Sequence, residues 1–172
     1  MDSIDVTKKG AALAAAEAGR FDALPIYKPE IECASREDIR ALQLEKLKET
    51  VAYAYERVPY YRQKLDEMGV APSDIQTLED VRKLPFTDKA VLRETFPFGL
   101  FAVPLDDIRE LHSSSGTTGK PVVVGYTDDD MDMWSECIAR LVQMAGVVPG
   151  DIAQMAFGYG MFTGGFGLHY GL

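Results

Sequence analysis

The stretch His112–Thr127, HSSSGTTGKPVVVGYT, decides how this chain is interpreted, because its composition changes abruptly within a few residues. Small hydroxyl residues and two glycines lead to one lysine and one proline, and then to a β-branched run. Backbone N–H groups exposed by glycines, hydroxyl groups and one ammonium together form a concave anion site, which phosphate oxygens satisfy well. The stretch therefore predicts a phosphate-binding loop that runs into a strand.

Two other interpretations of this loop compete with the first. A plain β-hairpin turn needs about two to five residues, whereas the segment SSSGTTGK is longer and carries more hydroxyl groups than a turn demands. The Walker pattern GxxxxGK[ST] fails, because its first glycine would stand at Ser114 and its hydroxyl residue at Pro121. The loop also leads into β sequence rather than a helix, so it has no helix dipole to use.

The segments around the loop predict an α/β arrangement. IRELHS before it and VVVGY after it suit strands, and DIAQMAF predicts a third strand. Between the second and third strands, Thr127 is the expected N-cap of a helix, DDDMDMWSECIARLVQMAG, which Gly146 ends. Strands separated by a helix predict the start of an α/β sheet.

The region upstream of the loop predicts mostly helix. Apolar residues recur at helical spacing from Ser35 to Val58, Pro59 closes that run, and PYYRQKLDEMGV predicts a second helix. Residues 1–30 predict a weak helix followed by an extended arm. The expected capping residues of the helical region are Ser35, Gly69, Thr77 with Asp80, and Thr87.

Composition limits the class of protein. The chain has 172 residues, 47% hydrophobic, and a net charge of −9, which argues against a nucleic-acid or anionic-membrane partner. Cys33 and Cys137 lie far apart without a CxxC spacing, so neither a disulfide framework nor a zinc site is predicted. The acidic run 128–130 fits a helix start better than a metal site. With no signal peptide and no membrane span in the sequence, a cytoplasmic protein is expected.

A cluster of aromatic residues near the end of the sequence predicts a site for an aryl group. Phe157, Tyr159, Phe162 and Phe166 are interspersed with five glycines, which would leave flat space between rings. Ordinary core aromatics beside a flexible turn are the alternative. The two histidines, His112 and His169, have no spacing to a serine and an acid that suggests a hydrolytic triad, so both are expected to be structural.

The quoted residues carry a resemblance. SSSGTTGKPVVVGYT resembles the phosphate-binding signature of the adenylate-forming superfamily, and its GKPVVVGYT part resembles the phenylacetate-coenzyme A ligase family in particular. VPYYRQKL, KLPFTDKAVLRETFPFGLFAVP and FGYGMFTGGFGLHYG are similar to the N-terminal region of that family. The resemblance covers roughly residues 35–172.

This resemblance implies the fold class and its divisions. The expected fold is α/β: a helical N-terminal region, then the start of the large N-terminal domain of an adenylate-forming enzyme, with an incomplete sheet. The divisions are an arm at 1–30, a mostly helical segment at 31–105, and the first part of a nucleotide-binding subdomain at 106–172. The small C-terminal catalytic domain of the family is absent, so an N-terminal fragment is expected.

The resemblance also implies an activity for the parent enzyme. It would be an ATP-dependent aryl-CoA ligase that uses ATP, Mg²⁺ and coenzyme A, activates phenylacetate or a similar aryl acid as an acyl-adenylate, and transfers the acyl group to coenzyme A. A homodimer, or assembly with a missing C-terminal part, is expected. The fragment alone is expected to be inactive; the alternative is a non-catalytic nucleotide-binding or assembly module acting with a separate C-terminal half.

Carried over residue by residue, the resemblance assigns the site as follows. The nucleotide would be held by Ser113, Ser114, Ser115, Gly116, Thr117, Thr118, Gly119 and Lys120, with Lys120 as the catalytic cation. The aryl acid would lie against Phe157, Tyr159, Phe162 and Gly164. No metal ligand from the protein is expected.

Overall fold

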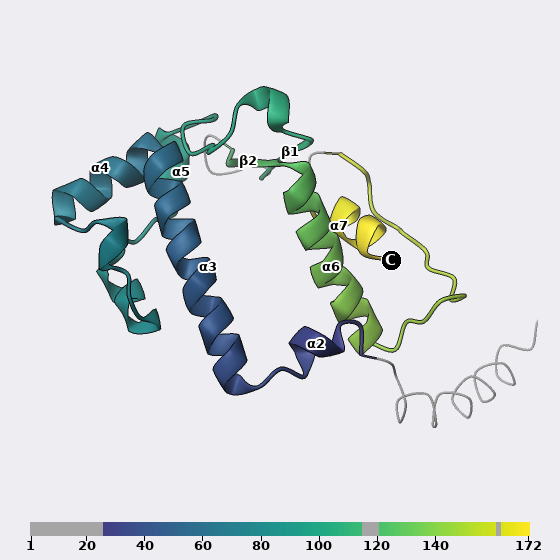
Figure 1. The fold of residues 1–172 in the computed structure, drawn as a ribbon. Helices are drawn as coiled ribbons and strands as arrows, with labels where there is room; N and C mark the ends of the chain where they lie inside the picture. Colours follow the sequence, from purple (N-terminus) through teal and green to yellow (C-terminus); the bar gives the residue numbers. More distant parts are fainter. Residues whose placement is uncertain (1–25, 115–120, 161–162) are drawn as a thin grey trace, which may run out of the picture.

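The computed structural model describes residues 26–114, 121–160 and 163–172. The two long helices, α3 and α6, are drawn apart from each other, with a two-stranded hairpin near one end of α6 and α2 near its other end (Figure 1). The elements in chain order are α2 (Pro29–Glu32), α3 (Arg36–Arg57), α4 (Pro59–Met68), the 3-10 helices η2 (Pro72–Asp74) and η3 (Leu78–Lys83), α5 (Lys89–Glu94), the 3-10 helix η4 (Leu105–Asp107), β1 (Glu110–Ser113), β2 (Val123–Tyr126), α6 (Asp128–Met144) and α7 (Thr163–Gly171).

Helices α3 and α4 begin and end where their sequences predict. The Ser35 hydroxyl accepts the Asp38 N–H at 3.1 Å, which caps the start of α3. Pro59 is the first residue of α4; a proline is tolerated there because the amide it lacks would have no helical partner. Gly69 ends α4 at φ 65°, a left-handed conformation that favours glycine.

The core of the helical region lies between α3, α4 and η2. Val51 of α3, Leu65 of α4 and Ile75 after η2 are buried together, and Ile75 is completely inaccessible. Around them pack Leu47, Tyr55, Val70 and Leu84. The Tyr55 hydroxyl donates to the Asp66 carboxylate at 2.8 Å, which fixes α4 against α3 at the edge of this core.

One expected cap is wrong by one residue. The carboxylate of Asp88, not the hydroxyl of Thr87, accepts the first free amides of α5, from Ala90 at 2.9 Å and Val91 at 3.1 Å. The hydroxyl of Thr87 instead lies 3.1 Å from that of Tyr61. A carboxylate can accept both N–H groups at once, so it is the stronger cap of the two neighbours.

Strands β1 and β2 pair antiparallel, with Glu110 opposite Tyr126 and Ser113 opposite Val123. Thr127 then starts α6 with a reciprocal capping box: its hydroxyl accepts the Asp130 N–H at 3.2 Å, and the Asp130 carboxylate accepts the Thr127 N–H at 2.9 Å. Both strands and this helix were predicted.

The predicted third strand, DIAQMAF, is wrong. The described segment between α6 and α7 is extended but has no strand neighbour, and it loops away from α6 before it returns to α7 (Figure 1). Ile152 is 99% exposed there. A strand needs a partner that accepts its backbone hydrogen bonds, and the apolar pattern alone does not supply one.

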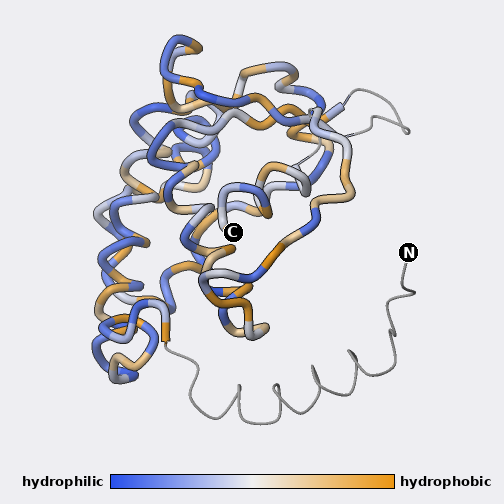
Figure 2. The backbone as a smooth tube through the Cα atoms, turned by 90° about the vertical axis from the view of Figure 1, so that its right-hand side faces the viewer, coloured by the Kyte–Doolittle hydropathy of each residue, from blue (hydrophilic) through white to orange (hydrophobic). Residues whose placement is uncertain are grey.

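The described residues therefore form a mostly helical body with a small two-stranded sheet, as the sequence predicts for a helical region followed by an incomplete sheet. Hydrophobic residues are spread along the chain, including the segment that precedes α7 (Figure 2). Phe86 and Met144 are among the large apolar side chains that remain exposed. In the described part of the chain, no helix has the length and apolar character that crossing a membrane requires.

The capping box of α6 gives a first prediction. Thr127→Ala removes the hydroxyl that accepts the Asp130 N–H, so the free energy of unfolding should fall by about 1 kcal/mol. Urea denaturation followed by circular dichroism measures this. Thr127→Ser keeps the hydroxyl and serves as the control; equal stability of the two variants would contradict the capping role.

The carboxylate of Asp80 gives a second prediction, on pH. The ammonium of Lys83, followed by the N–H groups of Gln76 and Thr77, holds the pKa of Asp80 far below its ordinary range in the folded chain. Because the folded-state pKa is depressed, the stabilisation is complete above the unfolded pKa of about 4 and is lost as the pH falls toward the folded value.

Asp80→Asn should therefore cost stability near neutral pH, and the difference from the unsubstituted chain should shrink steadily between about pH 5 and pH 2. Urea midpoints measured across that range test this. A difference that stays constant with pH would show that the side chain acts by hydrogen bonding alone.

Candidate functional site

The hydroxyl-rich loop leaves the sheet between two strands that hold its base closed. Beyond the last residue pair of the β1–β2 ladder, the Ser114 N–H donates to the Val122 carbonyl at 3.0 Å, and the Val122 N–H donates to the Ser114 hydroxyl oxygen at 3.0 Å. The hairpin and the phosphate-loop interpretations are thus compatible: the strands form a hairpin, and an unusually long polar loop connects them.

This base positions two of the predicted nucleotide-binding residues. Ser113 is the last residue of β1, and Ser114 follows it. The Ser114 oxygen accepts the Val122 amide with one lone pair, so its hydroxyl proton is still available to a further acceptor. The remaining predicted nucleotide-binding residues lie outside the described residues: Ser115, Gly116, Thr117, Thr118, Gly119 and Lys120.

The predicted aryl residues lie on and before α7. Phe157 and Tyr159 precede the helix and are about half exposed, at 53% and 48%, and Gly164 lies exposed in its first turn. The Tyr159 ring meets the Phe166 ring edge-on with centroids 5.1 Å apart, and the Tyr159 hydroxyl lies 3.1 Å from His169 Nδ1. Phe162 lies outside the described residues.

A carboxylate connects the strand before the loop to α7. One oxygen of Glu110 in β1 accepts the hydroxyl of Tyr170 at 2.6 Å, and the other lies 3.0 Å from His112 Nε2. The hydrogen bond to Glu110, with burial and the carboxylate's charge as smaller causes, raises the pKa of Tyr170, so this phenol stays a donor. The hydrogen bond between Glu110 and Tyr170 therefore links the strand before the predicted nucleotide loop to the helix that follows the predicted aryl segment.

Helix α7 also packs closely against α6 through two glycines. A Cβ built on Gly167 would lie 2.4 Å from the Trp134 indole, and one on Gly171 would lie 2.2 Å from the Ile138 side chain. The Trp134 ring stacks on Tyr126 of β2 at 5.0 Å between centroids. The absence of side chains at these glycines thus lets α7 approach the sheet and α6.

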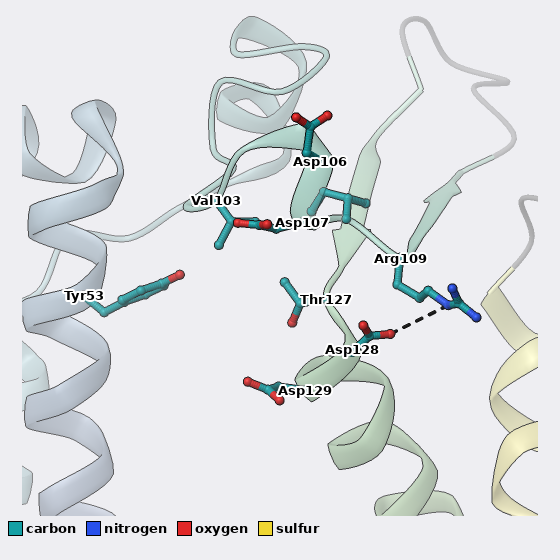
Figure 3. Close-up of a pocket in the computed structure, with 9 residues that line it drawn as sticks. Tyr53, Val103, Asp106, Asp107, Arg109, Thr127, Asp128 and Asp129 are labelled. Carbon is teal, nitrogen blue, oxygen red and sulfur yellow. Dashed lines mark ion pairs between the residues drawn. The ribbon is translucent and has the colours of Figure 1, made fainter.

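A hollow in the described surface is poorly suited to phosphate. A cavity of about 590 Å³ lies between α3 and the start of α6, lined by Tyr53, Thr127, Arg109 and the four aspartates 106, 107, 128 and 129 (Figure 3). The Arg109 guanidinium lies 3.7 Å from the Asp128 carboxylate, with which it pairs. Four carboxylates against one guanidinium repel an anion, so the hydroxyl loop remains the candidate phosphate site.

The sequence interpretation missed Glu110 and Tyr170, and it did not connect His112 with either predicted segment. Glu110 and His112 stand two residues apart in β1, so their side chains lie on the same face of the strand. This spacing can be recognised in the sequence. Tyr170 lies 60 residues further along the chain, and only the packing of α7 brings it to the same place. Among the described residues, no group of His, Cys, Asp or Glu is arranged to hold a metal ion.

No family model matches the chain. Curated proteins do: the phenylacetate-coenzyme A ligase of Thermus thermophilus is 55% identical over 146 residues, 85% of this chain and 33% of that protein. The Escherichia coli enzyme of the same name is 52% identical over 141 residues, 82% of this chain and 32% of that protein. The chain is homologous to phenylacetate-coenzyme A ligases. It spans about a third of the length of these ligases.

Solved structures agree with this homology. A 2-hydroxyisobutyryl-CoA ligase in complex with its acyl-AMP and CoA superposes with a TM-score of 0.78 at 30% identity, over 88% of this chain and 34% of that chain. The same ligase in its postadenylation state gives a TM-score of 0.72 at 30% identity, over 79% of this chain and 29% of that chain. The described fold is thus that of the N-terminal region of adenylate-forming CoA ligases.

The glycines of α7 give a third prediction. Gly167→Ala places a methyl group in steric overlap with the Trp134 ring, so it should destabilise the chain by about 1–3 kcal/mol and shift the emission of its single tryptophan. Gly165→Ala is the matched control, because its Cβ would meet its nearest neighbour at an ordinary 3.5 Å. Equal melting temperatures for the two variants would contradict the close approach of α7 to α6.

Proposed function

We propose that this chain is the N-terminal part of an aryl-CoA ligase that activates phenylacetate, or a similar aryl acid, in two steps. The acid carboxylate attacks the α-phosphorus of ATP, which forms an acyl-adenylate and releases pyrophosphate. The thiolate of coenzyme A then attacks the acyl carbon and displaces AMP. By comparison with its relatives, of which this chain matches about a third, catalysis is attributed to the longer protein.

The observation that carries the proposal is the hydroxyl-rich loop held between β1 and β2, with an aromatic segment joined to its base. A carboxylate and a triphosphate repel each other, so the reaction needs donors that neutralise charge and surfaces that align the two reactants. The proposed division of work is that the loop, from Ser113 to Lys120, grips the phosphates and Phe157, Tyr159, Phe162 and Gly164 receive the aryl group.

Mg²⁺ enters the proposal as the ion that accompanies ATP. An ion bound with ATP would be coordinated mainly by phosphate oxygens and water, as is common for Mg²⁺. Among the described residues, no group of His, Cys, Asp or Glu is arranged to hold it. The Ser114 hydroxyl, which already accepts the Val122 amide, is oriented by that bond and can donate to a phosphate oxygen. Ligand selection is therefore attributed to the hydroxyl loop and the aryl residues.

A chimaera tests the proposed activity. In it, this chain replaces the matching third of the Thermus thermophilus ligase, to which it is 55% identical. Phenylacetate-dependent exchange of pyrophosphate into ATP should be retained. Lys120→Ala in the chimaera should slow the exchange about 100-fold, because one preorganised charge at the transition state is lost. The exposed Lys89→Ala is the matched control; equal rates for the two variants would contradict the role of Lys120.

The aryl segment gives a further prediction. Phe162→Ala in the chimaera should reduce the preference for phenylacetate over a short aliphatic acid by about 1–3 kcal/mol, because one wall of the aryl site is removed. The ratio of kcat/KM for the two acids measures this preference. An unchanged ratio, with folding intact, would return Phe162 to a packing role.

A further inference from the structure

His112 occupies a position that packing alone does not explain. It lies in β1 directly before the loop, is only 2% exposed, and pairs with Val124 across the hairpin. Its Nε2 lies 3.0 Å from a Glu110 oxygen, so the ring is tethered to a carboxylate, which can only accept. Its Nδ1 is buried without a hydrogen-bond partner among the described residues. A buried nitrogen without a hydrogen-bond partner destabilises the folded chain, so an apolar ring would pack here more favourably.

Three aromatic rings from three elements surround the imidazole edge-on. Tyr126 of β2 lies 5.2 Å away between ring centroids, Trp134 of α6 5.6 Å, and Phe166 of α7 6.0 Å. All three meet it at 76–87°, so the ring cannot tilt without displacing a neighbour. Closely packed interiors transmit such displacements rather than absorb them.

His112 is linked by ring contacts to the predicted aryl segment and by the backbone to the base of the loop. On one side, Phe166 contacts Tyr159 of the predicted aryl segment at 5.1 Å. On the other, the backbone runs through Ser113 to Ser114, whose amide and hydroxyl close the base of the loop on Val122. A continuous set of contacts thus joins Tyr159 to Ser114 through His112.

We propose that His112, tethered by Glu110, is a positioning residue that couples an aryl acid at Tyr159 to a nucleotide at the Ser114 end of the loop. The inference rests on the proposed function for the identity of both ligands. Binding of the acid beside Tyr159 fixes Phe166, and through the imidazole it fixes the end of β1. The nucleotide then binds a base that is already ordered, so each ligand strengthens the binding of the other.

The test measures the coupling between the two ligands directly. In the chimaera, calorimetry gives the Kd of α,β-methylene-ATP, which cannot release pyrophosphate, with and without saturating phenylacetate. The unsubstituted chimaera should bind the analogue about 5-fold or more tightly with the acid present. His112→Phe keeps a ring and removes the tether, so the factor should fall below about 2. By the same linkage, the KM for the acid at saturating ATP should rise, with a smaller effect on kcat.

Two further variants separate coupling from packing. Glu110→Ala removes the tether, leaves all four rings in place and should also lower the coupling; it serves as the test if His112→Phe does not fold. Tyr170→Phe removes only the other hydrogen bond of Glu110 and should keep the coupling.

The measured coupling factors either support or overturn the inference. No coupling in the unsubstituted chimaera, or an unchanged factor in either folded variant, His112→Phe or Glu110→Ala, overturns the inference. Because the factor is measured without turnover, an inactive chimaera that couples its ligands, and loses coupling in these variants, would support the inference while contradicting the proposed activity.

Discussion

The candidate site depends on the closure of one hairpin. The ladder between β1 and β2, extended by the two hydrogen bonds between Ser114 and Val122, fixes where the hydroxyl-rich loop leaves the sheet. The same strands supply Glu110, His112 and Tyr126, around which α6 and α7 pack. Without this register, the residues that flank the loop would not contact the helix that follows the aryl segment. The helical body of α3 and α4 has a core of its own.

The sequence predicted local structure well because the decisive signals there are local. The caps at Ser35 and Thr127, the left-handed Gly69 and the proline at the start of α4 are each determined by a residue and its near neighbours. The error at Thr87 has the same origin, since the adjacent Asp88 is a stronger cap. The prediction of a third strand was wrong because strand formation depends on a partner strand elsewhere in the chain, and the pattern of DIAQMAF contains no information about such a partner.

The candidate site was predicted in part. The hydroxyl loop and the aromatic cluster are visible in the sequence as composition, and their roles in binding stay predictions. The connection between them was not predicted, since Glu110 and Tyr170 are 60 positions apart and meet only through the packing of α7. His112 was expected to be structural, and its burial agrees with that expectation. Its unpaired Nδ1 and its contact with the Glu110 carboxylate are features that a purely structural role does not need. The roles of the individual loop residues, a homodimer and a cytoplasmic location stay predictions.

The central claim is that a carboxylate becomes activated on the α-phosphate of ATP held by the hairpin loop. The most direct test supplies the chimaera with ATP, coenzyme A and phenylacetate labelled with ¹⁸O in both carboxylate oxygens, and analyses the nucleotide product by mass spectrometry. The account predicts AMP with one ¹⁸O atom, because the attacking oxygen stays on phosphorus when the thiolate displaces AMP. ADP with labelled inorganic phosphate would contradict it, because attack would then have occurred on the terminal phosphate.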